Sequence, residues 1–163
     1  MLIRQLDPNA DFAITRELHD RAADDLMLEH DRCVDTEMVI DFFNAAPPGI
    51  DRDTSLRVGL FTGQALAAIA ELSFGYPDKG DAYTGWLLVA ADQRGHAIGR
   101  HLLSYIESRA RNRGARCLLL AVLQDNPRGH AFWTRSGFSE TQHRALRQAG
   151  ERTHILIRMS SLL

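Results

Sequence analysis

The spacing of hydrophobic residues predicts a strand and two helices at the start of the chain. Leu2 to Leu6 alternates apolar and polar residues, as a half-buried strand does. From Asp11 onward an apolar residue recurs at every fourth position, which is typical of one face of an amphipathic helix. The recurring residues are Ile14, Leu18, Ala22 and Leu26. A second short helix is predicted over Glu37–Phe43, before a proline-rich loop at Ala45–Asp53.

The middle of the chain is predicted to contain three strands. Ser55–Phe61 and Gln64–Phe74 are mainly apolar runs separated only by Thr62 and Gly63, which predicts a tight antiparallel hairpin. Tyr83–Val89 is the third strand. The sheet is therefore expected to be antiparallel in this region.

A parallel crossover is predicted in the second half of the chain. A helix follows Tyr83–Val89, and Gly114 ends it as a residue just past a helix terminus does. The next segment, Cys117–Leu123, is apolar at successive positions, as a strand buried on both faces is. The order strand, helix, strand then favours parallel pairing of the two strands. The buried face of the helix is expected at Leu102, Leu103, Ile106 and Ala110.

The last elements complete the predicted fold class. Asn126 is a helix N-cap with proline at the first helical position, so a short helix is predicted over Pro127–Ser136. Two closing strands, Phe138–Arg144 and Thr153–Met159, enclose a loop with Ala149, Gly150 and Glu151. We therefore expect an α/β fold in which helices cover both faces of a mixed, mostly antiparallel sheet of about seven strands. All of residues 1–163 are assigned to a single domain.

Composition and charge exclude several classes of function. The chain has 163 residues, 45% of them hydrophobic, and a formal net charge of −2, so no basic surface for nucleic acid is expected. The start lacks the pattern of a signal peptide, and the longest apolar run, Leu118–Leu123, is far shorter than the roughly 18 residues of a membrane span. Cys33 and Cys117 do not form a disulfide framework. These features predict a cytoplasmic protein without a membrane partner, either a monomer or a homodimer.

A glycine-containing segment, DQRGHAIGRHLL, lies between the predicted strand Tyr83–Val89 and the helix after it. A helix N-terminus presents free backbone N–H groups and a partial positive charge, and so binds anions. Gly95 and Gly99 would let an anion approach the backbone, while Arg94 and Arg100 could bond phosphate oxygens. A flexible surface turn explains the same residues equally well. The spacing fits neither a P-loop nor the dinucleotide GxGxxG motif.

The segment RGHAIG, Arg94 to Gly99, resembles the (Q/R)xxGx(G/A) signature of the GNAT superfamily of N-acetyltransferases, although Ala97 stands where the family usually has glycine. NPRGHAFWTRSGF, beginning at Asn126, is similar to the second family signature, and the order of predicted elements agrees over essentially the whole chain. The resemblance implies that acetyl-CoA is the acyl donor. It implies a pyrophosphate site in the first segment and a pantetheine site on the preceding strand. The implied cofactor-binding residues are Leu87, Leu88, Val89, Arg94, Gly95, His96, Ala97, Ile98, Gly99, Arg100, Asn126, Phe132 and Trp133.

Acetyl transfer to an amine requires a base, and Glu71 is the candidate. Apolar neighbours would raise the pKa of its carboxyl group, although a strand position can also face water. Trp133 stands where many relatives have a tyrosine that protonates the thiolate; indole cannot release a proton near neutral pH, so packing is the favoured interpretation. Tyr83 and Trp86 could line an acceptor pocket, but packing is favoured for these aromatic residues too.

The remaining polar clusters have simpler explanations. The histidines lack the spacing of a metal site, so no metal is expected. Acidic residues near the amino end could attract a cationic acceptor, but a solvated helix face is the favoured account. They are Asp20, Asp24, Asp25, Glu29 and Asp31.

The sequence therefore favours an N-acetyltransferase that uses acetyl-CoA and acts on a small-molecule or peptide amine. A CoA-binding module without catalysis is the main alternative, and a nucleotide-binding domain is a third.

Overall fold

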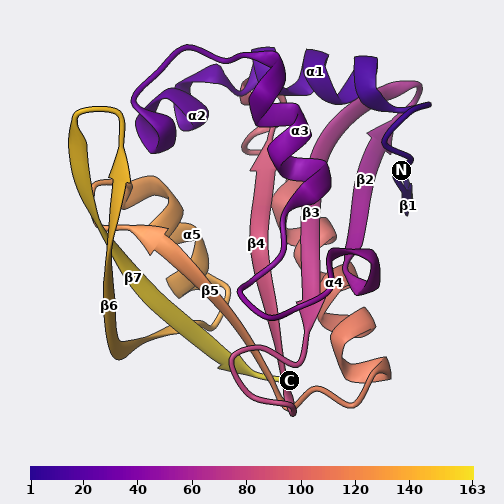
Figure 1. The fold of residues 1–163 in the computed structure, drawn as a ribbon. Helices are drawn as coiled ribbons and strands as arrows, with labels where there is room; N and C mark the ends of the chain where they lie inside the picture. The colour runs from indigo at the N-terminus through magenta and orange to yellow at the C-terminus, as the bar shows by residue number, and fades with distance from the viewer.

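The computed structural model describes residues 1–163, whose strands form one seven-stranded sheet in the order β1-β2-β3-β4-β5-β7-β6 (Figure 1). All neighbouring strands are antiparallel except β4 and β5, which are parallel. The strands are β1 (Leu2–Gln5), β2 (Leu56–Thr62), β3 (Ala65–Phe74), β4 (Asp81–Val89), β5 (Cys117–Leu123), β6 (Ser139–Ala149) and β7 (Arg152–Leu162). The helices are α1 (Phe12–Arg21), α2 (Ala23–His30), α3 (Thr36–Asn44), α4 (Ile98–Asn112) and α5 (Pro127–Arg135), with short 3-10 turns η1 (Arg52–Thr54) and η2 (Ala91–Gln93). None of the helices is long and apolar enough to cross a membrane.

Alternate residues of the central strands contribute side chains to two hydrophobic cores, one on each face of the sheet. On β3, Ala68 and Ala70 belong to the core covered by α4 and α5, whereas Ile69 belongs to the core covered by α1, α2 and α3. On β4, Leu87 packs against the first core and Leu88 lies in the second. Because the side chains of a strand alternate between faces, both layers of helices are held by the same two strands. The expected α/β sheet with helices on both faces is confirmed.

The parallel pair β4 and β5 is joined over only part of its length. Asp81 pairs with Cys117, Ala82 with Leu118 and Tyr83 with Leu119, and no pairing continues beyond these positions. The strands diverge from there, so that Figure 1 shows a V between β4 and β5 with α2 across its open end. The crossover is confirmed as parallel, and the splayed strands create space in the middle of the sheet.

The first predicted helix is in fact two helices. The backbone of Ala22 has φ −120° and ψ 23°, which ends α1 and allows α2 to begin at once in another direction. Leu18, Ala22 and Leu26 are all buried in the same core despite the break. The four-residue spacing of apolar residues continues across the break because both helices pack on the same face of the sheet. Alanine gives no sequence signal for a helix end. The prediction of one continuous helix was therefore wrong.

The terminal hairpin is longer than predicted. Strands β6 and β7 pair from Ser139–Ser160 to Ala149–Arg152, with a register shift between Glu140 and Arg144. Most residues of β6 are exposed, because it is the edge strand of the sheet. An exposed strand has no buried face to impose an alternating apolar pattern, so the sequence did not reveal its second half.

Candidate active site

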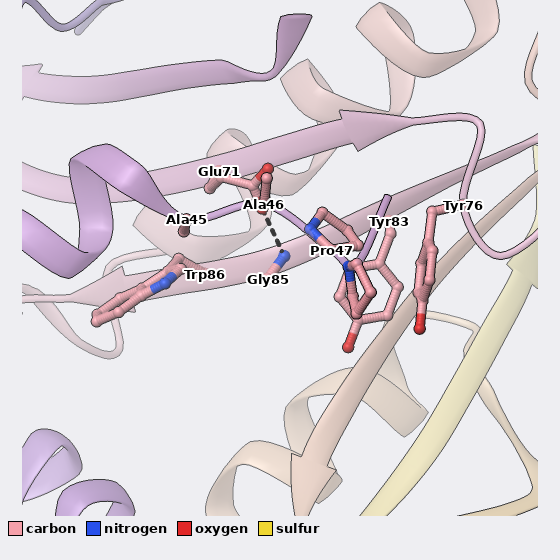
Figure 2. A pocket seen from close by; sticks show the side chains of 9 residues that line it. Ala45, Ala46, Pro47, Glu71, Tyr76, Tyr83, Gly85 and Trp86 are labelled. Carbon is pink, nitrogen blue, oxygen red and sulfur yellow. Dashed lines mark hydrogen bonds between the residues drawn. The ribbon is translucent and has the colours of Figure 1, made fainter. Parts of the chain in front are cut away.

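Two adjoining cavities lie where β4 leaves β5. The larger, about 240 Å³, is lined by the loop after α3 and by residues of β3, β4 and the connection between them (Figure 2). Its walls are Ala45, Ala46, Pro47, Pro48, Glu71, Tyr76, Tyr83, Gly85 and Trp86. The smaller, about 100 Å³, occupies the cleft between the splayed strands and is bounded by Leu26 of α2 and Trp133 of α5. Gly85 and Trp86 line both cavities and so form a wall that the two cavities share.

Glu71 is a buried carboxylate in the wall of the larger cavity, with only 1% of its surface exposed. Its Oε1 accepts a short hydrogen bond from Ser73 Oγ, and its Oε2 accepts one of 2.9 Å from the backbone N–H of Gly85. Ser73 Oγ lies 2.7 Å from Ser55 Oγ. Burial raises the pKa of Glu71, and the bonds from Ser73 and Gly85 and the positive charge of Arg57 oppose this shift without cancelling it. The expectation that Glu71 could face water is thus overturned.

A β-bulge explains why these groups converge. Glu71 pairs with Trp86, but Ser73 pairs with Tyr83, so β4 has one residue more than β3 between these pairs. The extra residue keeps Tyr83 and Trp86 on the same face as the carboxylate, and it leaves the N–H of Gly85 free to donate to Glu71. A Cβ at Gly85 would lie 2.9 Å from Glu71 Oε2, so a side chain there would displace the carboxylate. Packing was favoured for both aromatic residues, and the structure places both in the cavity wall.

The predicted anion loop follows β4 at the open end of the V. The backbone N–H groups from Gly95 to Arg100 donate to no backbone carbonyl, because these residues form the loop and the first turn of α4. Gly95 has φ +82° and Ala97 has φ +61°, both in the left-handed region. The position where this chain departs from the family's glycine therefore adopts a backbone conformation that glycine favours. Free N–H groups at a helix N-terminus fit a phosphate group.

Gly99 allows close packing as well as an open helix start. A Cβ at this position would lie 3.3 Å from Phe132 Cε2 and 3.5 Å from Val89 Cγ2. The absent side chain thus brings α4 against α5 and the end of β4. Ile98, the first residue of α4, is buried in the core, while His96 in the loop and Arg100 in the first turn of α4 are exposed.

The start of α5 borders the cleft from the other side. Asn126 caps the helix, since its Oδ1 accepts a 2.8 Å hydrogen bond from the N–H of Gly129. Trp133 is buried and packs edge to face with Phe132 and Phe138, at centroid distances of 4.9 and 5.2 Å. This packing agrees with the interpretation favoured for Trp133. Leu87, Leu88, Asn126 and Trp133 all line the cleft.

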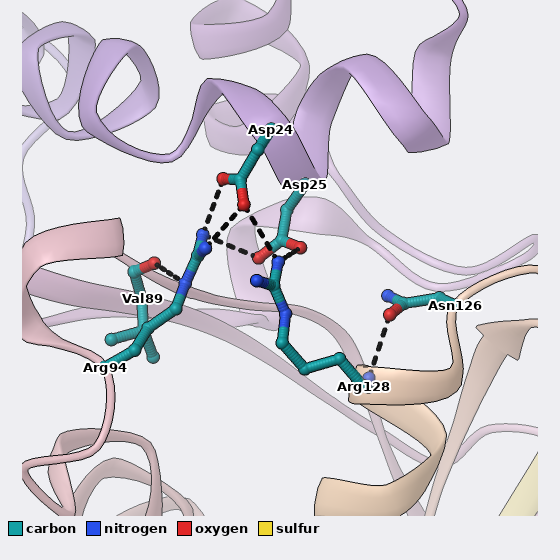
Figure 3. Close-up of polar contacts among 7 residues, drawn as sticks. Asp24, Asp25, Val89, Arg94, Asn126 and Arg128 are labelled. Carbon is teal, nitrogen blue, oxygen red and sulfur yellow. Dashed lines mark hydrogen bonds and ion pairs between the residues drawn. The ribbon is translucent and has the colours of Figure 1, made fainter.

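Two acidic residues of α2 bind arginines on both sides of the cleft (Figure 3). Arg94, at the loop, donates to Asp24 at 2.6 Å and to Asp25 at 2.9 Å, and its Nε bonds the carbonyl of Val89 at 3.2 Å. Arg128 of α5 lies 3.0 Å from Asp24 and also bonds Asp25. The bond from Arg94 is the main cause that lowers the pKa of Asp24. We call these four charged residues, Asp24, Asp25, Arg94 and Arg128, the α2 clasp.

The other acidic residues of the first helices are also ion-paired. Asp20 pairs with Arg16 within α1, whereas Glu29 pairs with Arg147 of β6 and Asp31 with Arg152 of β7. The interpretation of this cluster as a solvated helix face was therefore incomplete. Most of its carboxylates attach α2 to the loop, to α5 and to the terminal hairpin.

Several site residues were not found from the sequence. Ser73 follows Glu71 at the same-face spacing of a strand, which was an available signal, but its partner Ser55 lies in another segment, directly before β2. Tyr76 follows the end of β3, and no motif marks it as part of the cavity. Arg128 lies inside the second family-like segment, yet its partners come from α2, more than a hundred residues earlier.

The chain matches known acetyltransferases in sequence and in fold. The model of the Acetyltransferase (GNAT) family matches residues 17–138. An acetyltransferase from Thermus thermophilus has a TM-score of 0.78 at 21% identity, covering 100% of this chain and 98% of that one. A ribosomal-protein-alanine N-acetyltransferase from Brucella melitensis has a TM-score of 0.73 at 23% identity, with 100% of both chains covered. A Salmonella typhimurium protein solved with its cofactor acetyl-CoA has a TM-score of 0.71 at 19% identity, covering 100% of this chain and 94% of that one. A search of curated protein sequences gave no match.

Proposed function

The chain belongs to the GNAT acetyltransferase family, and we propose that it transfers an acetyl group from acetyl-CoA to a primary amine held in the larger cavity. The observation that carries the proposal is the position of Glu71. A buried carboxylate with a raised pKa lies in a cavity that shares Gly85 and Trp86 with the cleft between the splayed strands. Perturbed carboxylates in cavities are typical of acid–base catalysis.

The cleft and the loop provide a fitting site for acetyl-CoA. The free N–H groups from Gly95 to Arg100 can bind phosphate oxygens, helped by the partial positive charge of the α4 N-terminus. On the side that faces β5, the backbone of β4 beyond Tyr83 has no partner strand, so its N–H and C=O groups are available to an extended, amide-containing arm. Phe132 and Trp133 supply the apolar wall on the side of α5.

Glu71 acts as the base in this proposal. Bound acetyl-CoA supplies the thioester carbonyl to which the amine nitrogen bonds as the carbon–sulfur bond breaks. An amine arrives mainly as an ammonium ion and must lose a proton before its lone pair can attack. A carboxylate whose pKa is raised is a stronger base than an exposed one, and the hydrogen bonds from Ser73 and Gly85 hold it in a fixed orientation.

Trp133 does not act as an acid in this proposal. Its indole is packed between two phenylalanine rings and cannot release a proton near neutral pH. The CoA thiol is sufficiently acidic to leave as a thiolate, so that water can protonate it later. The tryptophan instead fills the cleft wall and excludes solvent from it.

Acceptor-dependent release of the CoA thiol tests the proposal. The purified chain is incubated with acetyl-CoA and a broad panel of primary amines, and free thiol is measured together with acetylated product. We expect release only with amines, and loss of release in Glu71→Gln with unchanged affinity for acetyl-CoA. Acetyl-CoA binding without turnover of any amine would instead assign the chain to CoA-binding modules. Stabilisation by ATP but not by CoA would favour a nucleotide-binding domain.

A further inference from the structure

The larger cavity has chemically different ends. Figure 2 shows Trp86 at one end and Tyr76 at the other, with Glu71 and Gly85 between them. Glu71 is the one charged residue in the lining, and the rest of the wall is aromatic, proline, alanine and glycine. An amine at Glu71 therefore places the remainder of the acceptor between these apolar walls.

A half-buried arginine lies at the Tyr76 end. Arg158 is on β7, and its Nη2 is 3.4 Å from Tyr76 Oη, with the guanidinium carbon 5.8 Å from the centre of the ring. Tyr76 in turn packs edge to face on Tyr83 at 5.3 Å. Burial raises the pKa of Tyr83 to about 12, and the positive charge of Arg158 opposes this shift.

Arg158 differs from the other partly buried arginines of the site in having no strong partner. Arg94 is bound by the carboxylates of the α2 clasp. Arg57 donates to the carbonyls of Ala45 at 2.6 Å and Arg52 at 2.9 Å. Arg158 forms no ion pair, and its one hydrogen bond from the side chain is the long contact with Tyr76. A guanidinium that is partly desolvated and has no anionic partner is strongly stabilised by a carboxylate, which it can bind through two parallel hydrogen bonds.

We infer that the acceptor carries a carboxylate at the end opposite its amine, and that Arg158 and the hydroxyl of Tyr76 bind this group. The inference rests on the proposed acetyl transfer. It identifies the substrate class as compact ω-amino acids with an apolar or aromatic middle. The amine then lies at Glu71, the middle lies between the aromatic and proline walls, and the carboxylate lies at β7. Arg158 is a specificity-determining residue in this arrangement and takes no part in bond making.

Matched acceptors that differ only in the carboxylate test the inference. We compare kcat/KM for 4-(aminomethyl)benzoate with that for benzylamine, and tyrosine with tyramine as a control in which the carboxylate is next to the amine. The wild-type chain is expected to prefer 4-(aminomethyl)benzoate over benzylamine by about tenfold or more, as a charged hydrogen bond provides. Tyrosine should gain no such advantage over tyramine.

Arg158→Gln should reduce the preference to about one by raising KM for the carboxylated acceptor, with benzylamine unaffected, and Arg158→Lys should retain part of it. Arg111→Gln, on the exposed face of α4, is the matched control and should change neither acceptor. Equal use of both acceptors by the wild type, or an equal loss for both in Arg158→Gln, would overturn the inference and leave acetyl transfer intact. Failure of every amine, with or without a carboxylate, would overturn the proposed function and this inference with it.

Discussion

Replacing Ala97 by glycine should stabilise the protein, although alanine is normally the more stabilising residue. Ala97 is exposed and has φ +61° and ψ 7°, directly before the first residue of α4. The left-handed conformation costs an L-residue about 1–2 kcal/mol because Cβ approaches the carbonyl oxygen. Glycine avoids this cost, and little packing is lost because the methyl group faces solvent.

The expected gain is smaller than the strain that is removed. Glycine makes the unfolded chain more flexible, which lowers stability by about 0.4–1 kcal/mol. Glycine is also a better N-cap than alanine by a few tenths of a kcal/mol or more. The net change for Ala97→Gly is therefore a gain of about 1 kcal/mol, or roughly 2–4 °C in melting temperature for a chain of this size.

Chemical denaturation of matched variants provides the assay. Ala13→Gly is the control, because Ala13 is exposed in the first turn of α1 and has ordinary helical geometry. We expect the control to lower the free energy of unfolding by about 0.5–1 kcal/mol, opposite in sign to Ala97→Gly. A loss of stability in Ala97→Gly as large as that in the control would refute the reasoning, since it would mean that residue 97 is not held in the left-handed region.

Four further predictions concern the site. Glu71→Gln should lower kcat/KM by about 10²–10⁴ and remove the fall in rate at low pH, as measured in pH–rate profiles; retention of that fall would exclude Glu71 as the base. Burial raises the pKa of Glu71 in the folded state above its ordinary value of 4.5, so the folded chain keeps a proton that the unfolded chain has lost. The stability of the wild type should therefore decrease as pH rises from about 4.5 toward the raised pKa. Urea titrations at several pH values should show this slope in the wild type and not in Glu71→Gln. Asp24→Asn combined with Asp25→Asn should tighten acetyl-CoA binding in calorimetry, because carboxylates no longer compete with phosphates for the arginines. The double variant should also lose about 1 kcal/mol or more of stability, because the α2 clasp is a partly buried network of ion pairs. Weaker binding would show that the carboxylates support the site. Gly99→Val should weaken acetyl-CoA binding and reduce stability by about 1–3 kcal/mol, because the new side chain would meet Phe132, and unchanged values of both would contradict the packing described.

The sequence predicts the fold well wherever a segment has a buried face. The strand Cys117–Leu123 and the helix Pro127–Arg135 follow from an apolar run and from a capped start, both of which are local signals. The break at Ala22 and the outer half of β6 were missed because neither has a local signal. Ala22 is buried at the break, as Leu18 and Leu26 are on its two sides, so the apolar pattern continues through it. Strand β6 is an exposed edge.

The site was predictable only in the parts that motifs describe. The segment from Arg94 to Gly99 lies between β4 and α4 as predicted, and its binding of a phosphate stays a prediction. The structure adds the reason why its alanine position favours glycine. Arg94 was predicted to bind a phosphate, but the structure shows it bound to Asp24, because tertiary packing brings α2 over the loop. The cavity behind Glu71 depends on a bulge in β4, and a bulge is a property of two paired strands, so one strand's sequence does not show it.

Both tryptophans of the chain lie at the site, since Trp86 lines the two cavities and Trp133 lines the cleft. Selective excitation of indole therefore reports on this region alone, with no background from elsewhere in the molecule. Trp86 also packs near the imidazole rings of His19 and His30, at centroid distances of 5.9 and 6.1 Å, so the two fluorophores have different neighbours. Unlabelled protein can thus be titrated with donor or acceptor by its intrinsic emission, and replacing either tryptophan by phenylalanine would separate the two signals.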